Sequence, residues 1–185
     1  AVLCVGRLAP EKNLDTLLAA FAAMRALNPR LRLVLVGDGP LRATLQQRCP
    51  DAVFTGLRRG TDLAAHYASG DLFVFPSLTE TFGNVVPEAL ASGLPVLAFD
   101  CAAAAQLLKP GSNGLLAPPG DTQAFVRQAE ALAADRQGTA AMGRAARESA
   151  LGMGWDGIVG QVEAVMRQAL HMAGAPARQE RLLYQ

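Results

Sequence analysis

Short aliphatic runs alternate along the chain with longer segments in which apolar residues recur every three or four positions. The short runs have the length and composition of buried strands, and the longer segments have the period of helices. This alternation is typical of a parallel sheet that is covered by helices on both faces. The expected strands span residues 1–5, 31–36, 52–55, 72–75, 95–99 and 114–117.

The helical segments follow the strands in turn. Leu14, Leu17 and Phe21 lie on one face of the first helix, and Asn13 or Asp15 can cap its start. After Asp121 the pattern is wholly helical, and the last segment is amphipathic. The expected helices span residues 13–27, 41–49, 62–69, 84–92, 102–108, 122–134, 139–150 and 155–172.

These elements predict one α/β domain with a Rossmann-like parallel sheet and a helical C-terminal end, over residues 1–172. Residues 173–185 form a polar tail that we expect to be mobile. The chain opens directly on an apolar run without a methionine. We therefore expect it to be a piece of a longer protein.

Charge and cysteine content exclude several classes of protein. Lysine plus arginine number 17 against 16 aspartate plus glutamate, which argues against nucleic-acid binding by bulk electrostatics. Cys4, Cys49 and Cys101 are far apart and suggest neither a disulfide framework nor a zinc site, so a reducing compartment fits. No apolar run reaches the roughly 20 residues of a membrane span. We expect a cytoplasmic protein with peripheral membrane contact at most, at the inner membrane face.

The unusual residues of the chain come directly after the predicted strands, where the loops of a parallel sheet share one edge. Arg7 and Lys12 lie in "GRLAPEKN" after the first strand. An arginine and a lysine in one loop before a helix suit a diphosphate, because they offer a planar fork and a point charge. They can equally be two solvated surface charges.

The second of these loops, "GDGP" at residues 37–40, resembles the start of a dinucleotide fingerprint. Arg42 stands where the third glycine of that fingerprint belongs, and no suitable acidic residue follows about twenty positions later. This argues against a nicotinamide-dependent dehydrogenase. The loop is predicted to be a tight turn whose backbone either contacts a ligand or only turns the chain.

The stretch "ETFGNVVPE", residues 80–88, places two glutamates on either side of a turn. The N–H groups of residues 82–84 can face an anion at the start of the following helix. Pro87 falls in the first turn of that helix, where the N–H group that proline lacks would have no partner within the helix. Glu88 can then accept hydrogen bonds from ribose hydroxyls, and Glu80 from those of a sugar. In the alternative interpretation Glu88 is a favourable charge near a helix start and Glu80 is an exposed loop residue.

Together with "GRLAPEKN", "LVGDGP", "FTGL" and "ASGLPVLA", this E-x7-E stretch resembles the nucleotide-sugar-binding C-terminal domain of retaining glycosyltransferases of the GT-B fold, family 4. The resemblance covers residues 1–172. It implies catalytic roles for Glu80, Arg7 and Lys12, with the sugar on Glu80 and the diphosphate on the two cations. The residues implied to complete the diphosphate and sugar site are Gly6, Thr81, Phe82, Gly83 and Asn84.

The resemblance also implies a nucleoside site, with the ribose on Glu88 and the base held largely by backbone groups. The implied nucleobase loops contain Gly37, Asp38, Phe54, Thr55, Leu57 and Arg58. The donor would be a UDP- or GDP-sugar. The acceptor, a glycan or glycolipid, would bind to an N-terminal domain that this chain lacks, and within the family the sequence looks most like bacterial mannosyl- or sugar-lipid transferases.

The chemistry implied by the resemblance is transfer of a hexose to an acceptor hydroxyl with retention, without a metal or other cofactor. The last helix would brace the missing half of the enzyme, and the isolated domain would bind nucleotide weakly and catalyse nothing. One departure is "FDCAAAAQLL" after the fifth strand, where many relatives have a Gly-Gly pair, and another is Pro87. A sugar-nucleotide epimerase of the same fold and a catalytically idle binding domain remain the alternatives.

Two further classes fit the sequence poorly. A signalling receiver domain needs clustered aspartates after the first strand, where this chain has Arg7. A glycoside hydrolase uses paired carboxylates across a scissile bond. Here the predicted phosphate site between the two glutamates favours a nucleotide donor instead.

Overall fold

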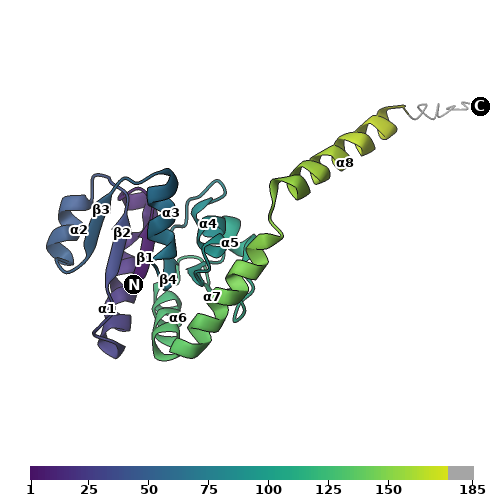
Figure 1. Ribbon diagram of the computed structural model, residues 1–185. Coiled ribbons are helices and arrows are strands. Elements are labelled where there is room, and N and C mark those ends of the chain that lie inside the picture. The colour runs from purple at the N-terminus through teal and green to yellow at the C-terminus, as the bar shows by residue number, and fades with distance from the viewer. Residues whose placement is uncertain (175–185) are drawn as a thin grey trace, which may run out of the picture. The chain divides into compact units, whose positions relative to one another are not determined.

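The computed structural model describes residues 1–174 and contains a six-stranded sheet in the order β3-β2-β1-β4-β5-β6, with every pairing parallel. The predicted α/β, Rossmann-like fold is thereby confirmed (Figure 1). Each strand agrees with its expected position to within two residues at either end. The strands are β1 (Val2–Val5), β2 (Leu33–Val36), β3 (Val53–Gly56), β4 (Leu72–Phe75), β5 (Val96–Phe99) and β6 (Gly114–Ala117).

The helices also occur in the predicted order, and all but one begin within two residues of the expected start. The helix expected from residue 139 begins at residue 136, because the carboxylate of Asp135 accepts the amide of Gly138 at 2.8 Å and satisfies a free donor of the first turn. A short 3-10 helix, Pro10–Lys12, was not predicted. The helices are α1 (Leu14–Leu27), α2 (Arg42–Arg48), α3 (Gly60–Ala68), α4 (Val85–Ala91), α5 (Ala102–Leu107), α6 (Thr122–Ala134), α7 (Arg136–Leu151) and α8 (Trp155–Gly174).

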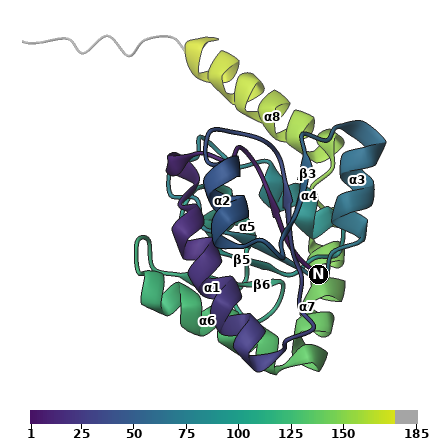
Figure 2. The same ribbon diagram turned by 90° about the vertical axis from the view of Figure 1, so that its left-hand side faces the viewer.

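Strand residues point alternately to the two faces of the sheet, and both faces are buried. One face packs against α1, α2 and α6, and the ring of Phe99 lies 4.8 Å from that of Phe125 in α6. On the other face, Phe73 lies 5.8 Å from Tyr67 in α3 and 5.9 Å from Phe75. Figure 2 shows α1, α2 and α6 together on one side of the strands and α3 and α7 on the other.

The turn that leads into α1 decides where Lys12 lies. The 3-10 helix ends at Asn13, which has the left-handed conformation (φ 51°) and is the N-cap of α1. Asn13, one of the two predicted caps, is thus the N-cap, although its side chain accepts no hydrogen bond from a backbone amide of the first turn. Asn13 accepts a hydrogen bond from the Thr16 hydroxyl at 3.1 Å, and Asp15 pairs with Arg48. The tight turn instead directs Lys12 back over the sheet edge.

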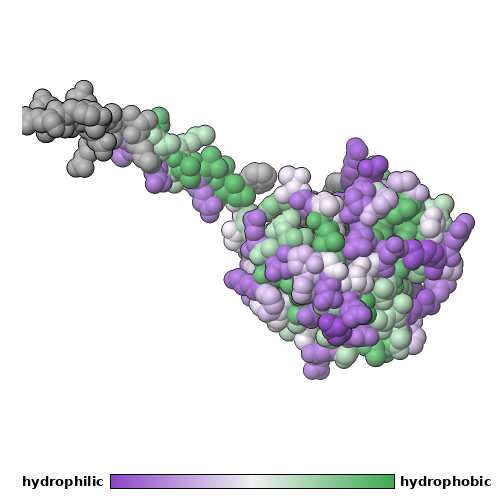
Figure 3. All heavy atoms as spheres, turned by 180° about the vertical axis from the view of Figure 1, so that it is seen from behind, coloured by the Kyte–Doolittle hydropathy of each residue, from purple (hydrophilic) through white to green (hydrophobic). Residues whose placement is uncertain are grey.

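Residues Ala1–Leu151 form one compact unit, and the described residues from Gly152 onward belong to a second unit. The predicted domain end at residue 172 thus remains a prediction, and most of the predicted polar tail lies outside the described residues. Within the second unit α8 is amphipathic, and both apolar and polar side chains are visible along it in Figure 3. No helix among residues 1–174 is long and apolar enough to cross a membrane. The exposed apolar side chains of α8 are Ile158, Val159, Val162, Val165, Met166 and Leu170.

Candidate active site

The carboxyl ends of β1 and β4 lie side by side at the centre of the sheet, where the strand order reverses. Loops diverge from such a switch point and leave a crevice in which ligands bind. Lys12 follows β1 and Glu80 follows β4, and the two side chains form an ion pair across this point. Residues 68 positions apart therefore meet where the topology predicts a ligand.

The Glu80 carboxylate is held on one side only. Its Oε1 atom accepts hydrogen bonds from the Lys12 ammonium and from the Ser77 hydroxyl, the latter at 2.6 Å. The Lys12 and Glu80 side chains are only 20% and 15% exposed, and the ammonium lies 5.9 Å from the centre of the Phe75 ring. Within the described residues Oε2 takes part in no hydrogen bond, so this oxygen remains available to a ligand.

Arg7 does not join this pair. Its side chain is 67% exposed, and its guanidinium lies 3.5 Å from the Glu11 carboxylate. The Glu11 carbonyl accepts a hydrogen bond from Thr79, which connects the two loops at 3.2 Å. The Gly6 amide is already bound to the Val36 carbonyl at 3.0 Å. The structure thus brings one of the two predicted cations to Glu80 and leaves the other at the solvent edge.

The loop between the two glutamates offers unpaired backbone donors. Among residues 1–174, no group of the chain accepts a hydrogen bond from the amides of Phe82, Gly83 or Asn84. Gly83 has φ 95°, a conformation that favours glycine. The Phe82 carbonyl binds the Ala103 amide at 2.7 Å, which connects the loop to α5. Thr81 and Phe82 are exposed at the rim of the crevice.

Glu88 lies on α4 and is exposed, and its Oε2 atom accepts a hydrogen bond from the Tyr67 hydroxyl at 2.8 Å. Tyr67 is buried, and burial, followed by the negative charge of Glu88 and this hydrogen bond, raises the pKa of its hydroxyl. Tyr67 and Ser77 were missed in the sequence analysis. Each places a hydroxyl in a largely apolar segment, which was the one available signal.

The two predicted nucleobase loops lie together beyond β2 and β3. The Gly37 amide donates to the Gly56 carbonyl at 2.9 Å. Arg42 connects the loops, because its guanidinium donates to Asp38 at 3.0 Å and to the Phe54 carbonyl at 3.4 Å. The fingerprint's missing third glycine is thus replaced by a side chain that fixes both loops.

Within the Phe54–Arg58 segment, part of the backbone is hydrogen-bonded to a side chain of the same segment. Arg58 donates to the Thr55 carbonyl at 2.7 Å and to the Asp62 carboxylate at 3.1 Å. Leu57 is 64% exposed and presents an apolar side chain beside these groups. The loop therefore offers an apolar surface with polar backbone groups at its margin.

The segment Phe99–Ala104, in which the resemblance leads us to expect a Gly-Gly pair, forms a wall beside Glu80. The Cys101 thiol lies 3.7 Å from the Ser77 carbonyl, and burial, then Asp100 and Glu80, raise the pKa of this thiol. The enclosed space between Glu80, Phe82 and this segment is about 10 Å³, too small for a sugar. A sugar would therefore have to lie on the open side of the loop.

Ala102 begins α5 with φ 49°, a left-handed conformation that disfavours alanine relative to glycine by about 1 kcal/mol. We expect Ala102→Gly to raise the free energy of unfolding by about 0.5–1 kcal/mol, measured by urea denaturation. Ala105→Gly, at an exposed position of the same helix, should lower it by about 1 kcal/mol. Equal losses in both variants would contradict the left-handed assignment.

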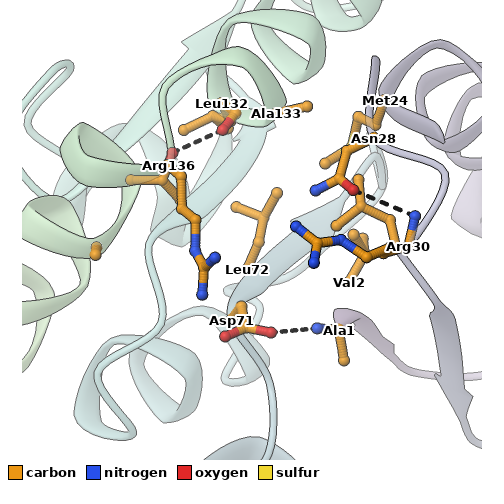
Figure 4. A pocket seen from close by; sticks show the side chains of 13 residues that line it. Ala1, Val2, Met24, Asn28, Arg30, Asp71, Leu72, Leu132, Ala133 and Arg136 are labelled. Atoms are coloured by element: carbon orange, nitrogen blue, oxygen red, sulfur yellow. Dashed lines mark hydrogen bonds and ion pairs between the residues drawn. The ribbon is translucent and has the colours of Figure 1, made fainter. Parts of the chain in front are cut away.

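A separate pocket of about 440 Å³ lies at the opposite, amino-terminal edge of β1 and β4. Figure 4 shows the guanidinium groups of Arg30 and Arg136 reaching toward its interior, and the Ala1 amino group bound to Asp71. Its floor is formed by apolar side chains such as Leu72. It contains none of the predicted site residues.

No group of three or more histidine, cysteine, aspartate or glutamate side chains suited to a metal occurs in the described residues. The expectation that the chemistry needs no metal stays a prediction. The two carboxylates of the site are engaged by an ammonium group and by a tyrosine hydroxyl.

Comparison with known proteins gives a consistent assignment. Residues 1–135 match the family described as Glycosyl transferases group 1. A GDP-mannose-dependent alpha-mannosyltransferase of Mycobacterium tuberculosis (strain CDC 1551 / Oshkosh) is 49% identical over 168 residues, which cover 87% of this chain and 42% of the relative. A GDP-mannose-dependent alpha-(1-6)-phosphatidylinositol monomannoside mannosyltransferase of Mycolicibacterium smegmatis is 35% identical, with coverages of 81% and 43%.

Among solved structures, that of Anabaena HepE in complex with UDP superimposes with a TM-score of 0.75 at 28% identity, covering 91% of this chain and 48% of HepE. The chain spans less than half the length of these relatives. The resemblance predicted from the sequence is confirmed at the level of family and fold.

Proposed function

Because the chain belongs to the Glycosyl transferases group 1 family, we propose that it binds the nucleotide-sugar donor in a retaining glycosyltransferase. The observation that carries this proposal is the Lys12–Glu80 pair across the switch point of the sheet. In this pair a cation suited to a diphosphate lies directly beside a carboxylate suited to sugar hydroxyls. The free amides of Phe82, Gly83 and Asn84 then complete the phosphate site.

The donor we propose first is GDP-mannose, since the names of both mycobacterial relatives specify it. A UDP-sugar remains the second candidate, because the solved HepE structure contains UDP. The acceptor we propose is a glycolipid or glycan, as the name of the second relative indicates for that enzyme. A domain outside this chain would bind it, with peripheral contact to the inner membrane face.

The proposed reaction breaks the bond between the anomeric carbon and the donor phosphate oxygen and forms the bond to the acceptor oxygen on the same face. The acceptor proton passes to the departing phosphate oxygen. Lys12, with Arg7 at the solvent edge, would stabilise the negative charge that develops on the diphosphate. Glu80 would orient the sugar through its free oxygen, and no step requires a metal.

An epimerase acting on the same donor would need the same binding site but no acceptor. The two mycobacterial relatives are named as mannosyltransferases, so they give no support to this alternative or to an idle domain. Incubating the full-length protein with GDP-mannose and a lipid acceptor separates them. Transfer gives a glycosylated lipid and GDP, whereas epimerisation gives a different nucleotide-sugar.

The direct test of the proposal is calorimetric titration of the chain with GDP and UDP. We expect weak, saturable binding of one nucleotide, and roughly tenfold weaker binding in Glu88→Ala, which removes the proposed ribose contact. Arg7→Ala should weaken binding less, because this side chain is largely solvated.

The matched control is Arg25→Ala, which removes an arginine on α1 that pairs with Asp51, away from the rim. Its affinity for nucleotide should equal that of the wild type. The proposal fails if neither nucleotide binds at millimolar concentration, or if Glu88→Ala binds as tightly as the control.

A further inference from the structure

Tyr67 contacts Glu88 of the candidate site, although it belongs to none of the motifs identified in the sequence. It lies on α3, is only 2% exposed, and packs against Phe73 with ring centres 5.8 Å apart. Its hydroxyl points to α4 and donates to Oε2 of Glu88 at 2.8 Å, across 21 positions of the chain. A buried residue of one helix thereby holds a carboxylate on the next.

This hydrogen bond constrains Glu88 more than Tyr67. The tyrosine ring is already fixed by its packing on the sheet, whereas the glutamate side chain is exposed and has several rotatable bonds. Within the described residues, Tyr67 is the side chain that donates to the Glu88 carboxylate. With Oε2 anchored, Oε1 has no hydrogen-bond partner among the described residues and stays available to a ligand.

We propose that Tyr67 is a positioning residue that orients the Glu88 carboxylate to receive the ribose hydroxyls of the donor nucleotide. The proposal rests on the proposed function, since it takes Glu88 as the ribose-binding group. A carboxylate that is already oriented loses less conformational entropy on binding than a freely rotating one. Tyr67 acts on the nucleotide only through Glu88 and does not itself touch the ligand.

The variant that tests this is Tyr67→Phe, which keeps the ring that packs on Phe73 and removes the hydroxyl. The readout is the ratio of affinities for the nucleotide that binds in the titration above and for its 2′-deoxy and 3′-deoxy forms. We expect the preference of the wild type for the intact ribose to fall roughly threefold to tenfold in Tyr67→Phe. Thermal denaturation of the variant verifies that it is folded.

Two controls separate positioning from a general structural effect. Ser92→Ala removes another hydroxyl that binds Glu88, at its backbone carbonyl at 2.9 Å, and should leave the ribose preference unchanged. In a Glu88→Ala background, Tyr67→Phe should have no further effect on the preference, because its target is absent.

The outcomes distinguish the two proposals. If Tyr67→Phe keeps the full wild-type preference for ribose, or changes it equally in the Glu88→Ala background, the positioning role is wrong and the donor-binding role stands. If the wild type shows no ribose preference, or binds no nucleotide, the role of Glu88 is wrong and the inference about Tyr67 falls with it.

Discussion

Replacing Gly37 with alanine is expected to lower the free energy of unfolding by on the order of 3–4 kcal/mol. An added Cβ atom would lie 1.9 Å from the Gly6 carbonyl oxygen, in a backbone conformation of φ 144° that alanine rarely adopts. The atoms that the added Cβ would meet belong to the Gly6 backbone and not to a flexible side chain, so the backbone at Gly37 or at Gly6 has to move. Urea denaturation measures the loss.

The control for this variant is Gly6→Ala. Gly6 has a similar conformation, φ 153°, but an added Cβ atom would meet nothing within 4 Å. It should therefore lose only about 1–2 kcal/mol, from backbone strain alone. The difference between the two variants measures the close approach of the loops after β1 and β2, and equal losses would contradict that approach.

Removal of the Lys12 ammonium is expected to have the next largest effect. Lys12→Met keeps an unbranched side chain near Phe75 but leaves the Glu80 carboxylate with Ser77 as its remaining partner. Because the pair is mostly buried, we expect a loss of about 2–3 kcal/mol in the free energy of unfolding at neutral pH.

A double-mutant cycle with Glu80→Gln tests the origin of that loss. In the Glu80→Gln background no carboxylate remains unpaired, so Lys12→Met should cost about 1–2 kcal/mol less than in the wild type. Arg25→Met, which breaks the exposed pair with Asp51, should lose under about 1 kcal/mol. Additive effects of the two substitutions would show that the ion pair is absent in solution.

The ion pair also connects stability with the proposed chemistry. Lys12 is held by Glu80 before any ligand is present, so a diphosphate would find the cation already in place. Such preorganisation reduces the rearrangement that binding requires. In the sequence interpretation Lys12 and Glu80 bind different parts of the donor independently. In the structure each of the two side chains is oriented by its ion pair with the other.

Local patterns were sufficient for the sheet, the order of its elements and the family. Each strand and helix was recognisable because its apolar period repeats over neighbouring residues, and the crossing rules of parallel sheets then bring the carboxyl ends to one edge. The E-x7-E stretch was equally visible because its members are close in sequence. Helix starts were less certain, since caps such as Asp135 depend on single hydrogen bonds.

The contacts that shape the site were decided only by the tertiary structure. Lys12 meets Glu80 over 68 positions, Tyr67 meets Glu88 over 21, and the Gly37 backbone lies against that of Gly6. No periodic pattern encodes such pairs, because each depends on how turns and side-chain conformations direct groups from separate elements. The sequence by itself therefore determined which loops follow the strands at one edge of the sheet, and packing determined which groups within them touch.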